Sequence, residues 1–468
     1  MKGIINNTEK LKEKETVQIT ISILSFIINK LKGTFYLKSI FNSSLFTIRV
    51  SFSAYNYSLI SFHYKKALTF IFLLFFFHFS YAQQLESYIK EAEQNNPQIQ
   101  AFELRYAIAN EKTNEVSNIP NTQFSAGYFV SEPETRTGAQ RAKFSVQQML
   151  PWFGTITARK NYVTSIAETE YVDITILKRK LALSVSTSFY QLFSLYKKQK
   201  ILEDNIGLLK TYEKLALTSV EVGKASAVDV LKLQIRQNEL KQKKEILEQE
   251  YLSEVAVFNS FLNRKSNLEI VLPTEMNLPV TNFRIDEEDL SLNPELLKYD
   301  KLYESIQQSE LLNQKERAPQ IGFGLDYVPV SQRSDVMMSD NGKDIIMPMV
   351  FVSIPVFNKK YNSKTRQNEL RQQEIEAEKN EKHNQLKVLL AKAISTMNIA
   401  KIQFKTQQEN LIQTKNAEQI LIKNYETGTV NFNDILDIQE LQLKFKTQQI
   451  ESIQLFYIQA AIHNYLTN

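Results

Sequence analysis

The long stretches without proline constrain this chain more than any other feature of its sequence. No proline occurs between Pro151 and Pro273 or after Pro355, and the 468 residues include only 11 Gly and 11 Pro. Both stretches are rich in Gln, Lys, Glu, Leu, Ile and Ala, which mostly favour helices. A helix over 156–222 alone would extend about 100 Å at 1.5 Å per residue. Helices of that length do not fit a compact domain, so we expect them to pack in a coiled-coil-like assembly.

Two short alternating segments interrupt the helical pattern. From Gln123 and again from Ile321, apolar residues alternate with small or polar ones, which is typical of strands. Each segment is followed by a polar stretch and then by a second strand candidate, over 143–150 and 346–354. The sequence therefore predicts two β-hairpins set between long helices.

The two halves of the chain share their landmarks in the same order. The recurring pairs are Asn96-Pro97 and Asn293-Pro294, Pro120 and Pro319, Pro151 and Pro355, Gly223 and Gly428, Asp229 and Asp434, and Asn263 and Asn468. Between 218–240 and 423–445, six positions are identical at a constant offset of 205. We interpret this as an internal duplication of one unit that contains a helix, a hairpin, a long helix, a glycine break and a second helix.

A targeting segment precedes the duplicated part. Lys65 and Lys66 are followed by an apolar run over 67–79 and by small residues at a signal-peptidase site that ends at Ala82. The run is shorter than the roughly 20 residues that a membrane-spanning helix needs. We therefore expect a signal peptide over 61–82, and the alternative is a buried core helix.

The formal charge of +5 lies mostly in the segment that we expect to be removed. Without residues 1–82 the charge is about −2, and basic runs are not interleaved with aromatic residues, so nucleic-acid binding is not expected. Residues 1–60 precede a signal peptide that should be N-terminal. We interpret them as an extension of doubtful reality, one that is translated in error from an upstream start. With no Cys and four scattered His, the sequence predicts no catalytic residues, no metal site and no cofactor.

Three motifs carry a resemblance to a known family. The chain resembles the TolC-type outer-membrane factors in QQMLPWFG (147–154), VGKASAVDVLKLQ (222–234) and NYETGTVNFNDILDIQELQL (424–443), and the resemblance covers 83–468. It implies a mainly α fold with β-hairpins, in which a duplicated long-helix and hairpin unit assembles as a trimer. The trimer would form a 12-stranded outer-membrane β-barrel that continues as a periplasmic α-helical barrel.

The number of strands independently favours an oligomer. Four strands cannot close a barrel, and an open sheet edge cannot sit in lipid because its backbone groups would lack hydrogen bonds. Within each copy we expect outer-membrane factor repeat 1 over 83–272, a linker over 273–292, and repeat 2 over 293–468.

The resemblance also implies a function. It predicts a passive exit duct in the outer membrane of a Gram-negative bacterium, which exports small molecules from the periplasm or an inner-membrane pump and is not an enzyme. Its expected partners are two further copies of itself, a periplasmic adaptor (membrane fusion protein), an inner-membrane transporter and outer-membrane lipid. Alternatives are the outer-membrane component of type I protein secretion or of metal-cation efflux. An alternative of another class is a periplasmic coiled-coil adaptor or scaffold, but such a protein needs no apolar hairpins.

Two glycines and two acids are candidate functional residues. The resemblance identifies Gly223 and Gly428 as the tip turns that dock the adaptor, and an ordinary helix C-cap is compatible with that role. Asp434 and Asp437 match two acids that form stacked rings at the family's pore constriction. On spacing alone, Asp434 is a capping acid and Asp437 a solvated surface acid. The first repeat has Lys232 where Asp437 falls, so only the second repeat supplies both acids.

A candidate latch joins the two repeats. Tyr425 matches a family tyrosine whose hydroxyl bonds the first-repeat acid, here Asp229, and holds the tip closed. The alternatives are that Asp229 forms a capping box with Ser226 and that Tyr425 packs on a neighbouring helix. The family's supporting arginine is replaced by Val430, which leaves the second lock of the family without its donor.

Overall fold

The computed structural model describes residues 82–223, 226–279, 290–335, 337–356 and 358–467. All of these residues belong to one compact unit, Phe75–Asn468. The expected extension and signal peptide lie outside the described residues, except for Ala82, where the first described helix begins. Half of the expected linker, 280–289, also lies outside them.

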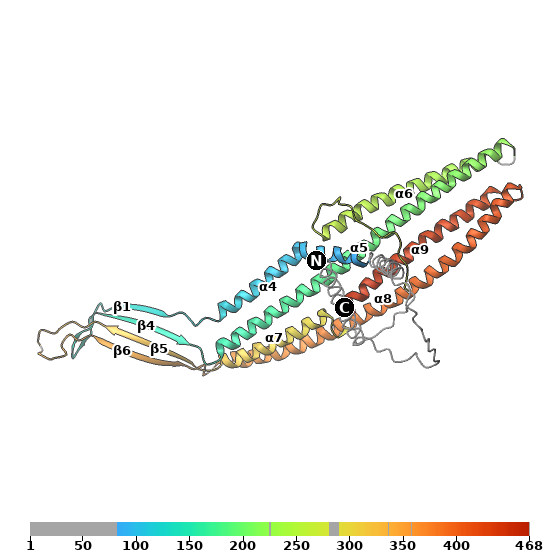
Figure 1. Ribbon diagram of the computed structural model, residues 1–468. Coiled ribbons are helices and arrows are strands. Elements are labelled where there is room, and N and C mark those ends of the chain that lie inside the picture. The colour runs from blue at the N-terminus through green and yellow to red at the C-terminus, as the bar shows by residue number, and fades with distance from the viewer. Residues whose placement is uncertain (1–81, 224–225, 280–289, 336, 357, 468) are drawn as a thin grey trace, which may run out of the picture. The chain divides into compact units, whose positions relative to one another are not determined.

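Long helices account for most of the described chain, and strands occur at two places in it (Figure 1). The described helices are α3 (Ala82–Asn95), α4 (Pro97–Val116), α5 (Thr155–Glu221), α6 (Ala227–Phe261), α7 (Pro294–Glu316), α8 (Lys360–Glu426) and α9 (Phe432–Thr467). The described strands are β1 (Gln123–Tyr128), β2 (Glu134–Thr135), β3 (Gly138–Ala139), β4 (Ala142–Leu150), β5 (Gln320–Val328) and β6 (Ile345–Ser353). None of the described helices combines the length and apolar character of a membrane span.

The two repeats have the same order of elements. In repeat 1, α4 is followed by the β1 and β4 hairpin, α5 and α6; in repeat 2, α7 is followed by the β5 and β6 hairpin, α8 and α9. The two longest helices, α5 and α8, have 67 residues each. The mainly α fold with two hairpins and the duplication of its elements are therefore confirmed.

The repeated Asn-Pro landmark is a helix start in both halves. The side-chain oxygens of Asn96 and Asn293 accept from the N–H groups of Gln98 and Glu295, each at 2.9 Å. A proline occupies the first helical position after each asparagine. Asparagine satisfies a donor that the helix start leaves open, and proline has no N–H to satisfy.

The hairpins of both repeats lie in one antiparallel sheet, in the order β1-β4-β5-β6. Val146 on β4 pairs with Phe124 on β1 and with Leu325 on β5, and Leu325 pairs with Pro348 on β6. Because side chains alternate along a strand, residues paired in this way share a face of the sheet. The described residues contain no partner strand for the outer edges of β1 and β6.

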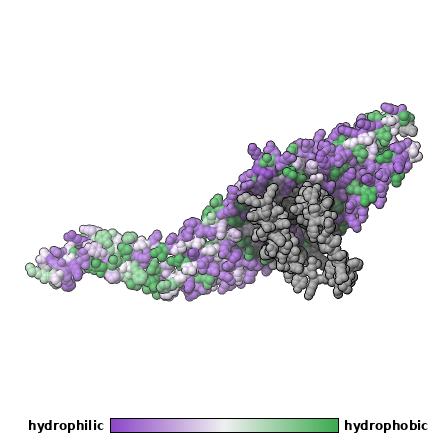
Figure 2. All heavy atoms as spheres, viewed as in Figure 1, coloured by the Kyte–Doolittle hydropathy of each residue, from purple (hydrophilic) through white to green (hydrophobic). Residues whose placement is uncertain are grey.

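One face of this sheet is apolar and exposed. Its apolar members are Phe124, Ala126, Tyr128, Phe144, Val146, Leu150, Ile321, Phe323, Leu325, Tyr327, Ile346, Pro348, Val350 and Val352. Phe124 is 76% exposed and Val350 is 69% exposed, and Figure 2 shows hydrophobic residues at the surface of this part of the unit. The strand pairing determines which residues share a face, and it places all of these side chains on the same side of the sheet.

The opposite face is formed by small and polar residues together with larger side chains from β6. The glycines of β5, Gly322 and Gly324, leave room there for the neighbouring strand. A Cβ atom at Gly322 would lie 1.9 Å from Cε2 of Phe351, and one at Gly324 would lie 3.1 Å from Cε of Met349. The two glycines therefore allow Phe351 and Met349 to lie across β5.

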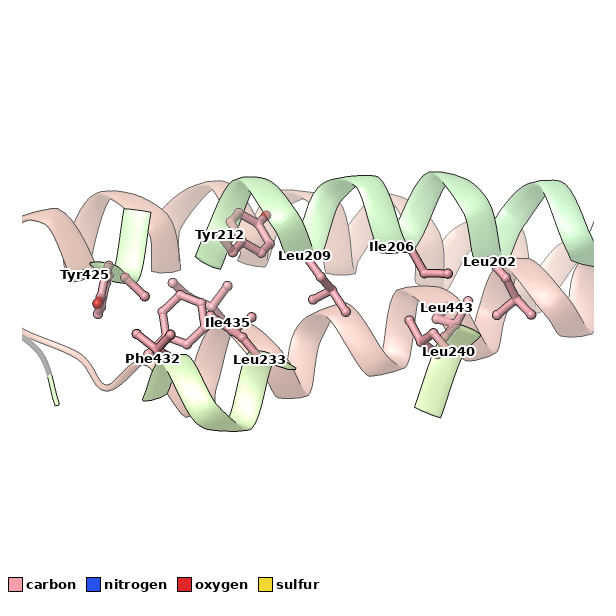
Figure 3. Close-up of a cluster of buried hydrophobic side chains, with 12 residues drawn as sticks. Leu202, Ile206, Leu209, Tyr212, Leu233, Leu240, Tyr425, Phe432, Ile435 and Leu443 are labelled. Carbon is pink, nitrogen blue, oxygen red and sulfur yellow. The ribbon is translucent and has the colours of Figure 1, made fainter. Parts of the chain in front are cut away.

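The helices pack as two hairpins that share a core. Helix α5 packs on α6, α8 packs on α9, and α5 also packs on α9. A buried cluster near the helix turns draws side chains from all four helices, among them Leu209, Leu233, Tyr425 and Ile435 (Figure 3). This shared core fixes the surroundings of the two glycine turns.

Candidate functional site

The two candidate tip turns are helix ends with glycine in a left-handed conformation. Helix α5 ends at Glu221 and α8 at Glu426, and the glycines that follow have φ of +71° (Gly223) and +79° (Gly428). This conformation strains residues that carry a Cβ atom. A Cβ atom at either glycine would meet no heavy atom within 4 Å. Both predicted helix breaks are confirmed, and the role of these turns in adaptor docking stays a prediction.

Backbone hydrogen bonds close both helix ends. At the second turn, the Gly428 N–H donates to the Tyr425 carbonyl at 3.0 Å and the Thr429 N–H donates to the Asn424 carbonyl at 2.9 Å. This pair of bonds is the Schellman arrangement. At the first turn, the Gly223 N–H donates to the Val220 carbonyl at 3.0 Å. The turn conformation therefore follows from the sequence within a few residues of each glycine.

Asp229 takes part in a capping box at the start of α6. The Ser226 Oγ accepts from the Val228 N–H at 3.2 Å, and the Asp229 Oδ2 accepts from the Ser226 N–H at 3.4 Å. Both bonds satisfy donors that the helix start leaves open, and the carboxylate also lies at the positive end of the helix dipole. The capping interpretation of Asp229 is confirmed.

Tyr425 is buried beside the start of α9. Its ring lies edge-on to that of Phe432, with centroids 5.2 Å apart and an interplanar angle of 67°. Its hydroxyl is buried and has no hydrogen-bond partner among the described residues. The bond from Tyr425 to Asp229 that the resemblance implies is thus not formed in this structure of one chain, and the latch stays a prediction.

Asp434 and Asp437 are both exposed in the first two turns of α9. The Asp434 N–H donates to the Asn431 carbonyl at 3.2 Å. Asp437 and Lys232 line the same cavity of about 270 Å³ between α5, α6 and α9. The Lys232 Nζ lies 3.0 Å from the Asn433 Oδ1, so this first-repeat cation reaches the start of α9. A pore constriction requires further copies of the chain, and that role stays a prediction.

A carboxylate and two amides connect the helices of the first hairpin. The two carboxylate oxygens of Glu213 on α5 accept from the amides of Gln234 (2.8 Å) and Gln237 (2.7 Å) on α6. These hydrogen bonds hold the pKa of Glu213 below its usual value. We call Glu213, Gln234 and Gln237 the first clamp.

The second hairpin has the same arrangement 205 positions later. Glu418 on α8 accepts from the amides of Gln439 and Gln442 on α9, the latter at 2.8 Å. We call these three residues the second clamp. It has an additional member, because the hydroxyl of Tyr212 on α5 donates to the Glu418 Oε1 at 2.5 Å. The Gln439 amide in turn donates to the Tyr212 hydroxyl at 3.2 Å.

Neither clamp was predicted from the sequence, although the sequence contains a signal for both. Two of the six identical pairs at the constant offset are the clamp glutamines, Gln234 with Gln439 and Gln237 with Gln442. Gln237 and Gln439 are buried, whereas glutamines in a polar helix are usually exposed. Identity at a fixed offset, rather than residue type, was therefore the useful signal.

The described side chains offer little reactive chemistry. In the parts of the chain that the structure describes, no group of three or more His, Cys, Asp or Glu residues could hold a metal ion. The buried polar contacts near the turns are carboxylates held by amides and a hydroxyl. Such contacts fix the relative positions of helices, and the exposed acids supply charge.

Comparisons with known proteins give a fold. No protein-family model matches the sequence, and no curated protein does. Among solved structures, the chain is similar to CusC, described for its transmembrane channel formation, at 13% identity and a TM-score of 0.67, covering 82% of this chain and 92% of that one. It is similar to the outer-membrane channel OprN at 15% identity and a TM-score of 0.66, covering 82% and 90%. The outer-membrane protein VceC from Vibrio cholerae gives 15%, 0.65, 82% and 96%.

These likenesses define the class of fold. The chain has the fold of outer-membrane channel proteins, over nearly the full length of the structures that it matches. This confirms the fold that the resemblance to TolC-type outer-membrane factors implies for a single chain. Among the similar solved structures, OprN, CmeC and MtrE are outer-membrane channels rather than enzymes.

Proposed function

We propose that this protein is the outer-membrane exit duct of a tripartite efflux system, and that it works as a homotrimer. The observation that carries the proposal is the sheet, which combines an exposed apolar face, an opposite face where small and polar residues of β1, β4 and β5 lie beside larger side chains of β6, and two edges that no strand of the described residues pairs. An exposed apolar surface that extends over four neighbouring strands marks a contact with lipid or with another protein. Three copies supply twelve strands, which is enough to close a barrel and remove every edge.

Three of the four strands in the sheet have the length of a lipid-spanning strand, and β1, with six residues, is shorter. Strands β4, β5 and β6 each have nine residues, and tilted strands that cross the hydrocarbon core of a bilayer need about 9–11. The alternation of apolar and polar residues gives a lipid-facing side and a lumen-facing side. Among solved channels, MtrE of Neisseria gonorrhoeae and CmeC of Campylobacter jejuni have this fold, which supports the outer membrane as the location.

The long helices provide the reach toward an inner-membrane partner. Helices α5 and α8, with 67 residues each, extend about 100 Å. Their far ends are the turns at Gly223 and Gly428, which are exposed and have open space around the glycine. We assign the docking of a periplasmic adaptor to these turns, and the transporter that drives export to the adaptor's other side. The duct itself is passive.

The two acids of α9 give the duct its charge selectivity. Three copies bring six carboxylates from Asp434 and Asp437 toward one axis, where they attract cations and repel anions. Lys232 lies in the same cavity as Asp437 and partly offsets its charge. Asp434, which does not line this cavity, is therefore expected to contribute more to the selectivity.

Tyr425 and Asp229 close the tip. The Tyr425 hydroxyl is buried without a partner in one chain, and a buried donor left unpaired costs about 1–3 kcal/mol. Asp229 keeps one carboxylate oxygen beyond the bond that it accepts from the Ser226 N–H. A rearrangement that brings this oxygen to the Tyr425 hydroxyl would satisfy the donor, which supports the latch.

Two adjacent residues on β1 allow a matched test. Phe124 lies on the apolar face and Ser125 on the other face, and both are exposed. A lysine at the bilayer midplane of the lipid face costs about 2–4 kcal/mol, whereas a lysine on the lumen face is tolerated. We expect the wild-type chain and Ser125→Lys to fractionate with outer membranes and to run as a trimer in unheated gel electrophoresis. Phe124→Lys is expected to reduce the trimer.

Recovery of the wild-type chain as a soluble monomer would contradict the exit-duct proposal and favour a periplasmic adaptor or scaffold. Equal loss of trimer in the two lysine variants would contradict the assignment of the faces. Both outcomes are read from the same gels, with heated samples as the monomer reference.

A further inference from the structure

The second clamp joins the two helix hairpins, whereas the first clamp lies within one hairpin. The bond from Tyr212 to Glu418 runs from α5 to α8, and the bond from Gln439 to Tyr212 runs from α9 back to α5. In repeat 2 the position equivalent to Tyr212 is Ala417, which has no hydroxyl and cannot return the contact. The hydroxyl bond between the hairpins is therefore made from repeat 1 only, and the ion pairs Lys198–Glu451 and Arg236–Glu440 join the hairpins beside it.

We propose that Tyr212 is a positioning residue that sets the separation of the two turns by holding the second clamp against α5. The proposal rests on the proposed function for its consequence, which is that this separation governs the closed state of the pore. The link itself is a property of the described chain.

The hydrogen bond between Tyr212 and Glu418 is buried and charge-assisted, so we expect it to fix the positions of both side chains. The Tyr212 side chain is 5% exposed, and Gln439 and Gln442 are buried as well. A hydroxyl that donates to a carboxylate forms a short, charge-assisted bond, and burial from water makes its loss costly. Burial, and then the bond to Glu418, raise the pKa of Tyr212, so the hydroxyl keeps its proton and remains a donor at neutral pH.

The ring of Tyr212 extends the link toward the second turn. It lies edge-on to Phe432, the first residue of α9, with centroids 6.2 Å apart. Phe432 also contacts the ring of Tyr425, which is near the end of α8. Figure 3 shows these three rings near one another in the buried cluster. One side chain of α5 thus contacts residues on both sides of the second turn, directly or through one neighbour.

Tyr212 lies some distance before the end of α5, so a change at its bond can alter the separation of the two turns. Tyr212 precedes Gly223 by eleven residues, which corresponds to about 16 Å of helix. Between this point and the turns, the hairpins also share apolar contacts of the buried cluster and the hydrogen bond from Lys232 to Asn433. Release of the Tyr212 bond leaves these contacts and the clamp amides of each hairpin in place, so we expect the turns to move apart without the hairpins separating completely.

The chain has no native Cys, so two introduced cysteines can report the separation. Val222 directly precedes Gly223, Glu426 lies two residues before Gly428, and both are exposed. We would place spin labels at Val222→Cys and Glu426→Cys in the purified full chain, dilute labelled with unlabelled protein, and measure the distance distribution within one chain. Tyr212→Phe removes only the hydroxyl and is expected to lengthen and broaden this distribution. Gln234→Ala, which breaks the first clamp, is expected to leave it as in the wild type.

A second pair of variants keeps the test independent of any misfolding. Glu418→Gln retains an oxygen that accepts from Tyr212 and is expected to keep the wild-type distribution, whereas Glu418→Ala is expected to match Tyr212→Phe. An unchanged distribution in Tyr212→Phe would overturn the proposal, and so would an equal change in Gln234→Ala. The distance measurement needs no channel activity, so a wild-type protein without conductance would count against the proposed function alone.

Discussion

The hydroxyl of Tyr212 on α5 donates a hydrogen bond to the Oε1 of Glu418 on α8 at 2.5 Å and so connects the two repeats at a buried point. The repeats share their fold but not their chemistry near the turns. Repeat 1 contributes the tyrosine and Lys232, and repeat 2 contributes the acceptor and Asp437. The two helix hairpins of the duplicated unit therefore differ: the first supplies the hydroxyl donor, and the second supplies the carboxylate acceptor.

The left-handed glycine of the second turn gives a prediction for stability. In Gly428→Ala the new Cβ meets no atom within 4 Å, so the expected loss of about 1–2 kcal/mol comes from backbone strain alone. Gly207→Ala is the matched control, because Gly207 lies inside α5 and also has open space around it. There alanine is expected to raise stability by about 0.5–1 kcal/mol. Thermal unfolding followed by circular dichroism measures both, and shifts of the same sign would contradict this account of the turn.

The glycine of β5 that faces Phe351 gives a prediction for assembly. Gly322→Ala places a Cβ atom 1.9 Å from the Phe351 ring, and the ring must move for the sheet to form. We expect a smaller fraction of heat-sensitive trimer in unheated gels. Gly127→Ala on β1 is the control, because its Cβ would meet nothing within 4 Å. Equal trimer fractions in the two variants would show that Phe351 does not need this space.

A partly buried carboxylate at the start of α7 gives a prediction for pH. Glu295 accepts from Tyr465 and pairs with Lys382 at 2.9 Å and Lys180 at 3.2 Å. Burial opposes its charge, but the hydrogen bonds from Tyr465 and Lys382 and the two lysine charges outweigh this and lower the pKa of Glu295 from 4.5 to about 2. The depressed pKa means that this stabilisation is full above pH 4.5 and is lost as the pH falls toward 2.

Glu295→Gln is therefore expected to cost about 2 kcal/mol at neutral pH. Its melting temperature should approach that of the wild type between pH 4.5 and 2, because the wild-type carboxylate becomes protonated there. Glu103→Gln is the control, since Glu103 is more than half exposed and lies 3.7 Å from Lys178. A melting-temperature difference that stays constant down to pH 2 would contradict the assigned charge.

The acids of α9 give a prediction for ion selectivity. Asp434→Asn together with Asp437→Asn is expected to weaken cation selectivity and block by multivalent cations, because the field near the axis loses its source. Reversal potentials in a salt gradient measure the effect. Glu245→Gln together with Glu248→Gln, on the exposed surface of α6, is the charge-matched control for the two removed acids. An unaltered reversal potential in the double variant would remove the ring assignment.

The latch gives a prediction in which two outcomes have opposite signs. If no bond forms, Tyr425→Phe removes a buried, unpaired hydroxyl and is neutral or stabilising. If Asp229 accepts from Tyr425 in the trimer, the same variant is destabilising and raises single-channel conductance, and so does Tyr425→Phe together with Asp229→Ala. Asp229→Ala alone also loses the bond from the Ser226 N–H in the capping box of α6, while the Ser226 hydroxyl still accepts from the Val228 N–H. Unchanged conductance in the double variant would end the latch hypothesis.

Local signals in the sequence predicted the fold well. The ends of α5 and α8 follow from Gly223 and Gly428, and the starts of α4 and α7 follow from Asn96 and Asn293, because these residues act within one turn of their own position. Alternation likewise located the hairpins. The order β1-β4-β5-β6 was less accessible, because the pairing of β4 with β5 joins strands from different repeats.

The sequence predicted less of the site, because its contacts are long-range. The Tyr212 hydroxyl bonds a residue 206 positions away, and no helical periodicity signals such a partner. Gln439 lies in a helix with many polar residues and is nevertheless only 3% exposed, and composition does not signal this burial. The resemblance to TolC-type outer-membrane factors implied a bond from Tyr425 to Asp229, but in one chain the Asp229 carboxylate caps its own helix. Burial and competing local partners, which spacing does not contain, decide such contacts.

The central claim is that copies of this chain close a water-filled duct through a membrane. Purified full-length protein reconstituted in a planar lipid bilayer tests it most directly. The account predicts stepwise single-channel conductance that prefers cations, from a species that runs as a trimer in unheated gels. A preparation that is trimeric and inserted in lipid but passes no current, even in the Tyr425→Phe and Asp229→Ala double variant, would contradict it.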